Sequence, residues 1–198
     1  MTTTSPRSRP RVEGEREAEI FSATRQLLVE YGYDRLTLAA VASAAKASKA
    51  TLYRRWSGKA DLVIDAVAGG GADRVIDTGS LRGDLMAAAE TPGDLADDLP
   101  GMIGALVAAL HRDAELTEAF RTRFLEPKLT QTRTIFERAR DRGEVAGQAD
   151  LQTLGSILPA LCSHEAFLFG VQTTPERIRQ IIDEVVLPAC RATLDSDS

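Results

Sequence analysis

The stretch that decides the fold is Leu36–Val63, LTLAAVASAAKASKATLYRRWSGKADLV. Thr37 precedes a short run of apolar residues at helical spacing, and Ser48 precedes a second short run. Serine or threonine directly before such a run is an N-cap signal, so the pattern predicts two short helices joined by a tight turn. Such a pair is typical of a helix-turn-helix, whose second helix enters the DNA major groove. Ser57 is expected to cap a third helix over residues 57–68.

The second of these helices carries side chains suited to DNA. Leu52 and Trp56 lie four positions apart and can anchor one side of the helix in a core. A helical hairpin on any protein surface has a similar composition, so composition alone leaves that alternative open. The other side offers the cations and hydroxyls that bind phosphates and base edges, from Lys49, Thr51, Tyr53, Arg54 and Arg55.

The same stretch closely resembles the DNA-binding domain of TetR-family transcriptional repressors. That pattern has a threonine, a helix of small apolar residues, Gly-Val-Ser, Thr-Leu-Tyr, a basic and aromatic pair and a lysine. This chain has Thr37, Val41-Ala42, Ala45-Lys46-Ala47-Ser48, Thr51-Leu52-Tyr53, Arg54-Arg55-Trp56 and Lys59. The resemblance implies a dimeric regulator of transcription with DNA contacts from Thr37, Lys46, Ser48, Lys49, Ala50, Thr51, Tyr53, Arg54 and Lys59.

These predicted contacts divide into two kinds. Lys49 and Ala50 lie at the start of the recognition helix, so we expect them to face bases. Thr37, Tyr53 and Lys59 are expected to bind phosphates.

One residue departs from the family pattern. Lys46 stands where the family usually has glycine in the turn. A left-handed backbone costs lysine about 1 kcal/mol, whereas glycine adopts it without strain. Either the turn differs slightly, or the strain is accepted because Lys46 contacts a phosphate.

Composition favours an all-helical protein. The 198 residues are 43% hydrophobic and 5% aromatic, enough for one or two small domains with aliphatic cores. No apolar run reaches about 18 residues and the N-terminus lacks a secretory signal, so we expect a cytoplasmic protein without membrane contact. Cys162 and Cys190 are expected to be reduced core residues, with a redox role as the open alternative.

Charge is distributed unevenly along the chain. The net charge is −5, yet residues 1–60 carry 11 Lys and Arg against 6 Asp and Glu. A basic head on an acidic body fits a DNA-binding protein.

The chain divides into three expected regions. Residues 1–12 form a flexible basic arm, which either stays disordered or reaches an adjacent minor groove. Residues 13–60 form the helix-turn-helix domain, with residues 57–68 as a linking helix. Residues 69–198 form a C-terminal ligand-binding and dimerisation domain, which brings the total to about nine to ten helices. Its expected helices span 81–90, 95–112, 114–124, Pro127 to Arg142, 150–169 and 174 to about 188.

The C-terminal region also resembles one subgroup of TetR C-terminal domains. The residues that carry this resemblance are 77–85, 137–144 and Asp150.

No catalytic or metal-binding pattern is present in the sequence. His111 and His164 lie far apart, and no nucleophile motif or CxxC pair occurs. We therefore expect no enzyme activity, no cofactor and no metal. The alternatives are a DNA-binding protein without ligand control and a small-molecule-binding protein or enzyme.

Two further sites are expected in the C-terminal region. A homodimer interface should form from the last two long helices, at Ile157, Leu161, Leu168, Ile178, Ile181, Ile182 and Val185, to match a palindromic operator. A pocket for a small, largely apolar effector should be lined by Met102, Leu106, Phe120, Phe124, Phe136, Leu158, Cys162, His164 and Phe167, although each could equally be ordinary core. Pro159 should kink its helix near Gly155, either as part of the pocket or only for packing.

Overall fold

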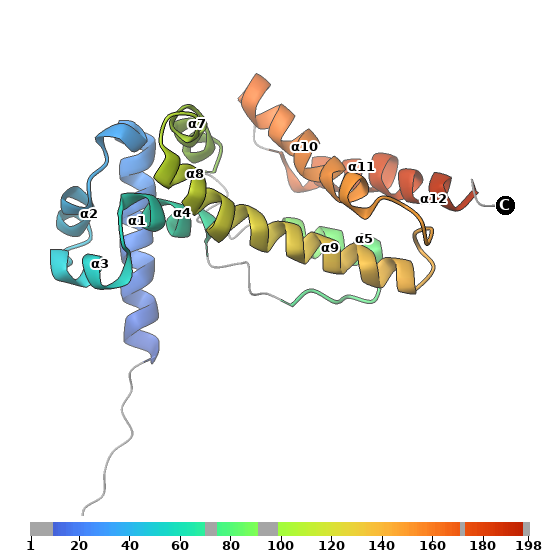
Figure 1. Cartoon of the computed structure of the whole chain (residues 1–198), viewed down its shortest axis with the longest axis horizontal. Helices are drawn as coiled ribbons and strands as arrows, with labels where there is room; N and C mark the ends of the chain where they lie inside the picture. The colour runs from blue at the N-terminus through green and yellow to red at the C-terminus, as the bar shows by residue number, and fades with distance from the viewer. Residues whose placement is uncertain (1–9, 70–74, 91–98, 171–172, 196–198) are drawn as a thin grey trace, which may run out of the picture.

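The computed structural model describes residues 10–69, 75–90, 99–170 and 173–195. Every regular element within these ranges is helical, which confirms the all-α prediction. Most of the predicted basic arm lies outside the described residues. Figure 1 shows the N-terminal helices at the left and the C-terminal helices at the right. The N-terminal helices are α1 (Pro10–Arg35), α2 (Leu38–Ala44), α3 (Lys49–Arg55) and α4 (Lys59–Ala68).

The capping predictions for the helix-turn-helix are largely confirmed. The Thr37 hydroxyl accepts from the Ala40 amide at 3.1 Å and starts α2, and the Ser48 hydroxyl accepts from the Thr51 amide at 3.1 Å and starts α3. The third cap was assigned wrongly. Gly58 is the N-cap of α4, and the Ser57 hydroxyl instead donates to the Asp61 carboxylate.

The C-terminal helices form one series after the linker. They are α5 (Leu81–Ala89), α7 (Leu99–Leu110), α8 (Ala114–Phe120), the π-helical turn η2 (Arg121–Leu125), α9 (Glu126–Asp141), α10 (Leu151–Phe169), α11 (Pro175–Ile181), the π-helical turn η3 (Ile182–Val186) and α12 (Leu187–Asp195). The predicted start of α7 at residue 95 falls outside the described residues.

Two prolines that were expected at helix boundaries lie inside continuous helices. Residues 114–141 form one rod through α8, η2 and α9, so Pro127 does not start a separate helix. Proline has no N–H and its ring crowds the carbonyl four residues back. The backbone widens just before Pro127, where the Glu126 amide donates to Arg121, five residues back. The Leu187 amide donates to Ile182 in the same way before Pro188.

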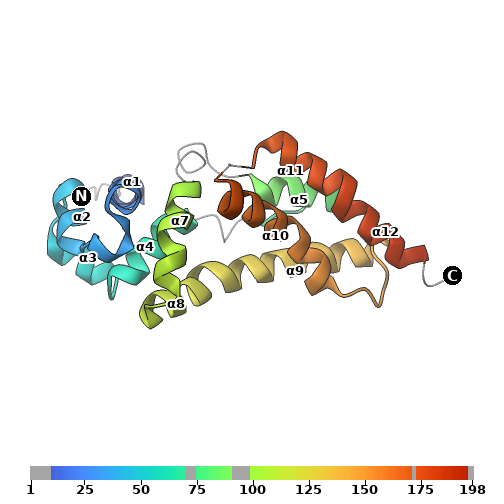
Figure 2. The same cartoon turned by 90° about the horizontal axis from the view of Figure 1, so that it is seen from above.

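Two hydrophobic cores hold these helices together. The first joins the helix-turn-helix to α7 and α8, and it buries Trp56 and Leu62 with Met102, Leu106 and Leu116. The second lies between α5 and α9–α12, around Phe136 and Ile182. Figure 2 shows α8 and α9 running from the first group of helices to the second. The cores therefore do not divide at residue 69, where the sequence places the domain boundary, because α7 and α8 share a core with the head.

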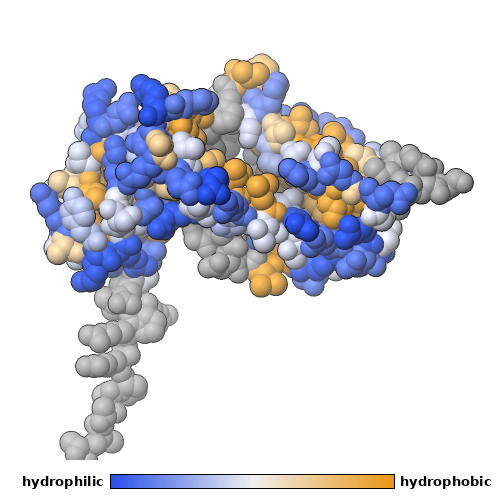
Figure 3. Space-filling model, in the orientation of Figure 1, coloured by the Kyte–Doolittle hydropathy of each residue, from blue (hydrophilic) through white to orange (hydrophobic). Residues whose placement is uncertain are grey.

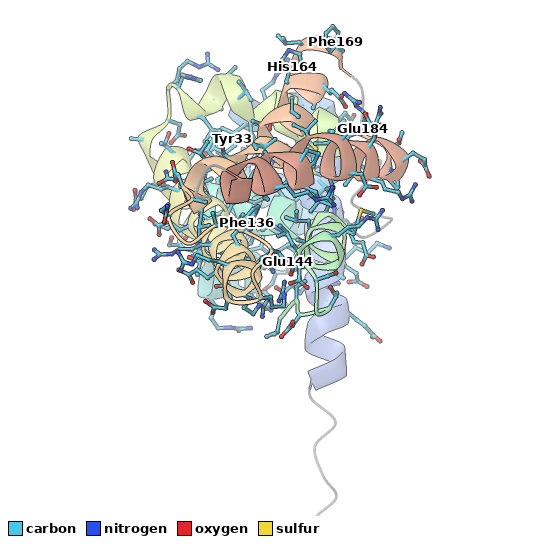
Figure 4. The ribbon with its side chains drawn as sticks, turned by 90° about the vertical axis from the view of Figure 1, so that its right-hand side faces the viewer. Tyr33, Phe136, Glu144, His164, Phe169 and Glu184 are labelled. Atoms are coloured by element: carbon cyan, nitrogen blue, oxygen red, sulfur yellow. The ribbon has the colours of Figure 1, made fainter. Side chains whose placement is uncertain are left out.

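The motif residues of the C-terminal region form a polar cluster at the end of α9. Thr78 donates from its amide to the Asp84 carboxylate at 2.6 Å, and the Leu81 amide donates to Glu144 at 2.9 Å. Arg142 donates to Glu144 at 2.6 Å and lies 3.5 Å from Asp84. Asp84 is fully buried, and its Oδ1 also accepts from the Thr78 hydroxyl at 2.8 Å. The cluster thus fixes the start of α5 on the end of α9 (Glu144 in Figure 4).

Candidate functional site

Helix α3 presents one face to solvent and buries the other. Leu52 lies in the first core, and Trp56, the residue directly after α3, is buried in it as well. The side chains of Lys49, Ala50, Tyr53 and Arg54 are exposed, and the Tyr53 side chain is 60% exposed. This helix can therefore approach another molecule with cations and a phenol while its opposite side stays in the core.

The end of α3 is fixed to α4 through Trp56. Its indole N–H donates to the Asp65 carboxylate at 2.9 Å, and its ring lies 5.9 Å from the Phe21 ring centroid. Because the donor is satisfied by a residue of α4, the orientation of α3 depends on the position of α4.

The turn before α3 has the strained geometry that the sequence suggested. Lys46 has φ 51°, and it is the one residue other than glycine with positive φ among those described. Its carbonyl accepts from Arg16 of α1, and Glu17 of α1 pairs with Arg55 at the end of α3. Helix α1 therefore contacts both the turn and the far end of α3. Of the two alternatives left open by the sequence, the positive φ of Lys46 fits the one in which the left-handed turn is kept, and the phosphate contact of Lys46 stays a prediction.

Two of the predicted phosphate ligands have partners inside the protein. The Lys59 ammonium donates to the Tyr33 carbonyl at 3.0 Å and lies 4.0 Å from the Tyr33 ring centroid. Thr37 is the N-cap described above. The Lys59 contact could not be predicted from the sequence, because Tyr33 lies 26 residues away along the chain. Their binding to DNA stays a prediction, as do the roles of Ser48 and Thr51.

Comparison with known proteins decides what this head belongs to. Residues 20–66 match the model for bacterial regulatory proteins of the tetR family, and residues 75–185 match the model for a tetracyclin repressor-like C-terminal domain. The chain belongs to the TetR family of transcriptional regulators. It is therefore a DNA-binding regulator of transcription, and not an enzyme.

Relatives of this TetR-family regulator span nearly its whole length. The DNA-binding transcriptional repressor TetR of Mycobacteroides abscessus is 34% identical over 180 residues, covering 89% of this chain and 94% of that protein. An uncharacterized HTH-type regulator of Mycobacterium tuberculosis is 34% identical over 176 residues, with coverage of 88% and 87%. Among solved structures, GusR of Salmonella enterica has the same fold, with a TM-score of 0.64 at 15% identity and coverage of 91% and 96%.

The predicted effector-pocket residues of this TetR-family regulator do not gather around one cavity. Met102 and Leu106 lie in the first core, where Phe120 and Phe124 stack at 5.1 Å. Phe136 lies in the second core, with Leu158 and Cys162 packed against it. His164 is exposed and contacts Phe169, far from Phe136 (Figure 4). The side chain of Phe167 lies outside what the structure describes.

The structure instead shows a hollow of about 520 Å³ beside η2 and α9. None of the nine predicted residues lines it. Much of its lining is a row of polar residues at four-residue spacing, which in a sequence is typical of a solvated helix face. The hollow therefore could not be predicted from the sequence pattern. The lining residues are Val75, Ile76, Thr122, Glu126, Pro127, Thr130, Gln131, Thr134, Ile135 and Arg138.

The predicted dimer residues fall on two sides of the subunit. Ile181 and Ile182 are buried in the second core, so the expectation that they form a seam is corrected. Leu168 and Val185 are 68% and 42% exposed, while Ile157, Leu161 and Ile178 are half-buried. Figure 3 shows hydrophobic residues on the surface over α10 and α11.

Within the last helix, Val185 differs from its buried neighbours. Ile182 and Val186 are buried, whereas Val185, inside the π-turn between them, is 42% exposed. A regular helix places the third and fourth positions after Ile182 on the same side, so the sequence pattern does not separate Val185 from Val186.

Neither thiol is suited to reaction. Cys190 is buried and Cys162 is half-buried. Burial raises the pKa of each, which lowers the fraction of reactive thiolate. Within the described ranges no group of His, Cys, Asp and Glu could hold a metal ion, and no helix is long and apolar enough to cross a membrane.

Proposed function

We propose that this TetR-family protein is a ligand-responsive repressor that binds a palindromic operator as a homodimer and leaves it when a small, largely apolar effector binds. The observation that carries the proposal is the exposed face of α3, held from behind by Leu52 and Trp56. One such helix reads one half-site, so a two-fold dimer matches a palindrome. The M. abscessus relative is named as a repressor, which supports repression here.

The proposal is tested with DNA from upstream of the protein's own gene. The purified protein should bind this duplex with two subunits per site, measured by sedimentation with a labelled duplex. Small apolar molecules are then screened for release of the bound DNA. Specific binding without any releasing molecule would favour the alternative of a DNA-binding protein without ligand control.

The dimer seam is proposed to use the outer side of α10–α12. Leu168 and Val185 leave large apolar surface in water, and Leu161 of α10 is half-buried. Val185→Glu places a carboxylate on this surface and should give folded monomers that bind DNA weakly. Leu129→Glu makes the same change at an exposed leucine of α9, outside the seam, and should leave the dimer intact. A Val185→Glu dimer of normal mass would overturn the seam.

The effector is proposed to bind in the hollow beside η2, with its apolar part against Ile76, Pro127 and Ile135 of the lining. An occupant there contacts the rod that joins the two cores, at the point where its helix is widened. Thr130→Trp fills the hollow, so operator binding should persist while release by effector is lost. Leu129→Trp places a tryptophan at the preceding residue, which does not line the hollow, and should release normally. Equal release by both variants would place the effector elsewhere, such as among the residues predicted from the sequence.

A further inference from the structure

One arginine of the C-terminal helices pairs with α4, the last of the N-terminal helices. Arg123 lies in η2, and its Nε is 2.9 Å from an Asp61 oxygen of α4. Its Nη1 lies 3.1 Å from both carboxylate oxygens of Asp65, one turn further along α4. The planar guanidinium suits such a bridge because its donors point in fixed, separate directions. Figure 2 shows α4 beside α8, the helix that η2 continues.

One of the bridged carboxylates also holds the recognition helix. Asp65 accepts from the Trp56 indole at 2.9 Å, and the Trp56 amide closes α3 by donating to Leu52 at 2.9 Å. A continuous series of polar contacts therefore runs from Arg123 in the body, through Asp65, to the end of α3.

The electrostatics favour this arrangement over an incidental surface pair. Asp61 and Asp65 are like charges one helical turn apart, which repel without a cation between them. Burial alone would lower the pKa of Arg123, but Asp65 and Asp61 outweigh it and raise the pKa above its usual value. The Asp61 and Asp65 side chains are only 16% and 28% exposed, so solvent screens the bridge incompletely.

We infer that Arg123 is a positioning residue for operator recognition. It sets the angle of α4 against the body and, through Asp65 and Trp56, the direction of α3. Losing it removes no DNA contact but lets the head take orientations that fit one half-site at a time. The inference rests on the proposed operator binding, and it adds the residue through which the body controls the head.

A neighbouring residue provides a matched control. Arg121 lies in the same π-turn and carries the same charge, but it pairs with Glu118 and Glu126 of its own rod. Arg121→Ala and Arg123→Ala therefore remove equal charge from nearly the same place, and only the second breaks a contact with α4.

Fluorescence tests the contact without any DNA. Trp56 is the only tryptophan of the chain, so its emission reports on this junction alone. Arg123→Ala should increase quenching of Trp56 by acrylamide, whereas Arg121→Ala should not. Arg123→Lys, whose ammonium lacks the fork that spans both carboxylates, should fall between them. Equal quenching in the wild type and Arg123→Ala would remove Arg123 from the positioning of Trp56.

Binding measurements test the consequence. The probes are a labelled duplex selected by the wild-type protein from a random-sequence pool, and an unrelated duplex of the same length. Arg123→Ala should weaken the selected duplex by about two- to fivefold, the range expected for partly exposed ion pairs. Affinity for the unrelated duplex and the salt slope should stay unchanged. Arg121→Ala should leave all of these values unchanged.

A double-mutant cycle separates the bridge from a general loss of stability. Asp65→Asn keeps an oxygen for the Trp56 indole but removes the charge that Arg123 bridges. In a background with Asp61→Asn and Asp65→Asn, the further change Arg123→Ala should therefore have little effect on specific binding. An undiminished effect in that background would refute the route through α4.

Two other results have distinct meanings. If Arg123→Ala weakens both duplexes equally and lowers the salt slope by about one unit, Arg123 is a phosphate contact and the inference fails. If the wild type selects no sequence, the proposed function fails, while the fluorescence comparison still decides whether Arg123 holds Trp56.

Discussion

Replacing Lys46 by glycine should stabilise the protein, because the turn before α3 is strained. Lys46 has φ 51°, a conformation that costs a residue with a Cβ about 1–2 kcal/mol. Glycine removes this strain but adds about 0.5–1 kcal/mol of chain entropy to the unfolded state. The difference leaves a stabilisation of about 0.5–1 kcal/mol, or a rise in Tm of about 1–4 °C for a chain of this length.

Lys46→Ala is the matched control. Alanine removes the same charge but keeps the Cβ, so the strain remains and the stability should hardly change. Urea unfolding of the wild type and both variants, followed by circular dichroism, gives the comparison at equal slope. Equal stability of the glycine and alanine variants would refute the argument from backbone strain.

The same two variants separate strain from DNA binding. If the Lys46 ammonium lies on a phosphate, both substitutions should weaken DNA binding equally and lower the salt slope by about one unit each. Unchanged salt slopes in both variants would remove Lys46 from the DNA contacts and leave the strain without that explanation.

Three other substitutions or treatments test separate features. Ile182→Glu should unfold the chain rather than give monomers, since a carboxylate without a partner in the second core costs about 3 kcal/mol or more. A folded dimer of this variant, seen by circular dichroism and sedimentation, would contradict the buried position of Ile182. The Leu116 amide donates to the Asp113 carboxylate and lowers the pKa of Asp113, so Asp113 adds stability above its unfolded pKa of about 3.9, and this stability is lost as the pH falls. Asp113→Asn caps the helix without titrating, so this variant should lose less stability than the wild type between about pH 6 and pH 3. Parallel profiles of stability against pH for the two proteins would refute this. Cys162 and Cys190 should react slowly with iodoacetamide in the native protein and rapidly in urea, because burial raises the pKa of both; fast native labelling would speak for a redox role.

The local rules of the sequence were sufficient for the helix-turn-helix. Thr37 and Ser48 cap their helices as predicted, since capping depends on residues within one turn. Lys46, which stands where the family usually has glycine, has the positive φ of such a glycine, because the turn fixes that dihedral whatever residue occupies it. The motifs in both halves of the chain predicted the family, and the matches of both halves to TetR-family models confirm it.

The predictions from the sequence were wrong where a helix departs from the regular α-helical period. Pro127 and Pro188 suggested helix boundaries, but each is accommodated by a π-turn directly before it. The apolar spacing predicts Val185 on the same face as Ile182, but Val185 lies inside a π-turn and is 42% exposed while Ile182 is buried. The spacing of the apolar residues does not reveal a π-turn unless it is known which of them are buried.

Contacts between residues far apart along the chain also could not be predicted from the sequence. The pairing of Lys59 with Tyr33, and of Arg123 with Asp65, joins residues that no spacing rule connects. The hollow beside α9 is lined by a polar helix face that is typical of a solvated surface. These features follow from how the helices pack, and they carry the proposals on the effector and on Arg123.

Exposed residues of α3 are proposed to read DNA sequence in a two-fold dimer. The most direct measurement is selection from a random-sequence duplex pool, with the wild type and with Lys49→Ala side by side. The wild type should enrich a palindrome whose half-sites lie about one helical turn, 34–36 Å, or a multiple of it apart. Lys49→Ala should enrich the same palindrome with preference relaxed at one symmetric pair of positions. Enrichment of no sequence by the wild type, or identical sequences for both proteins, would contradict the role assigned to α3.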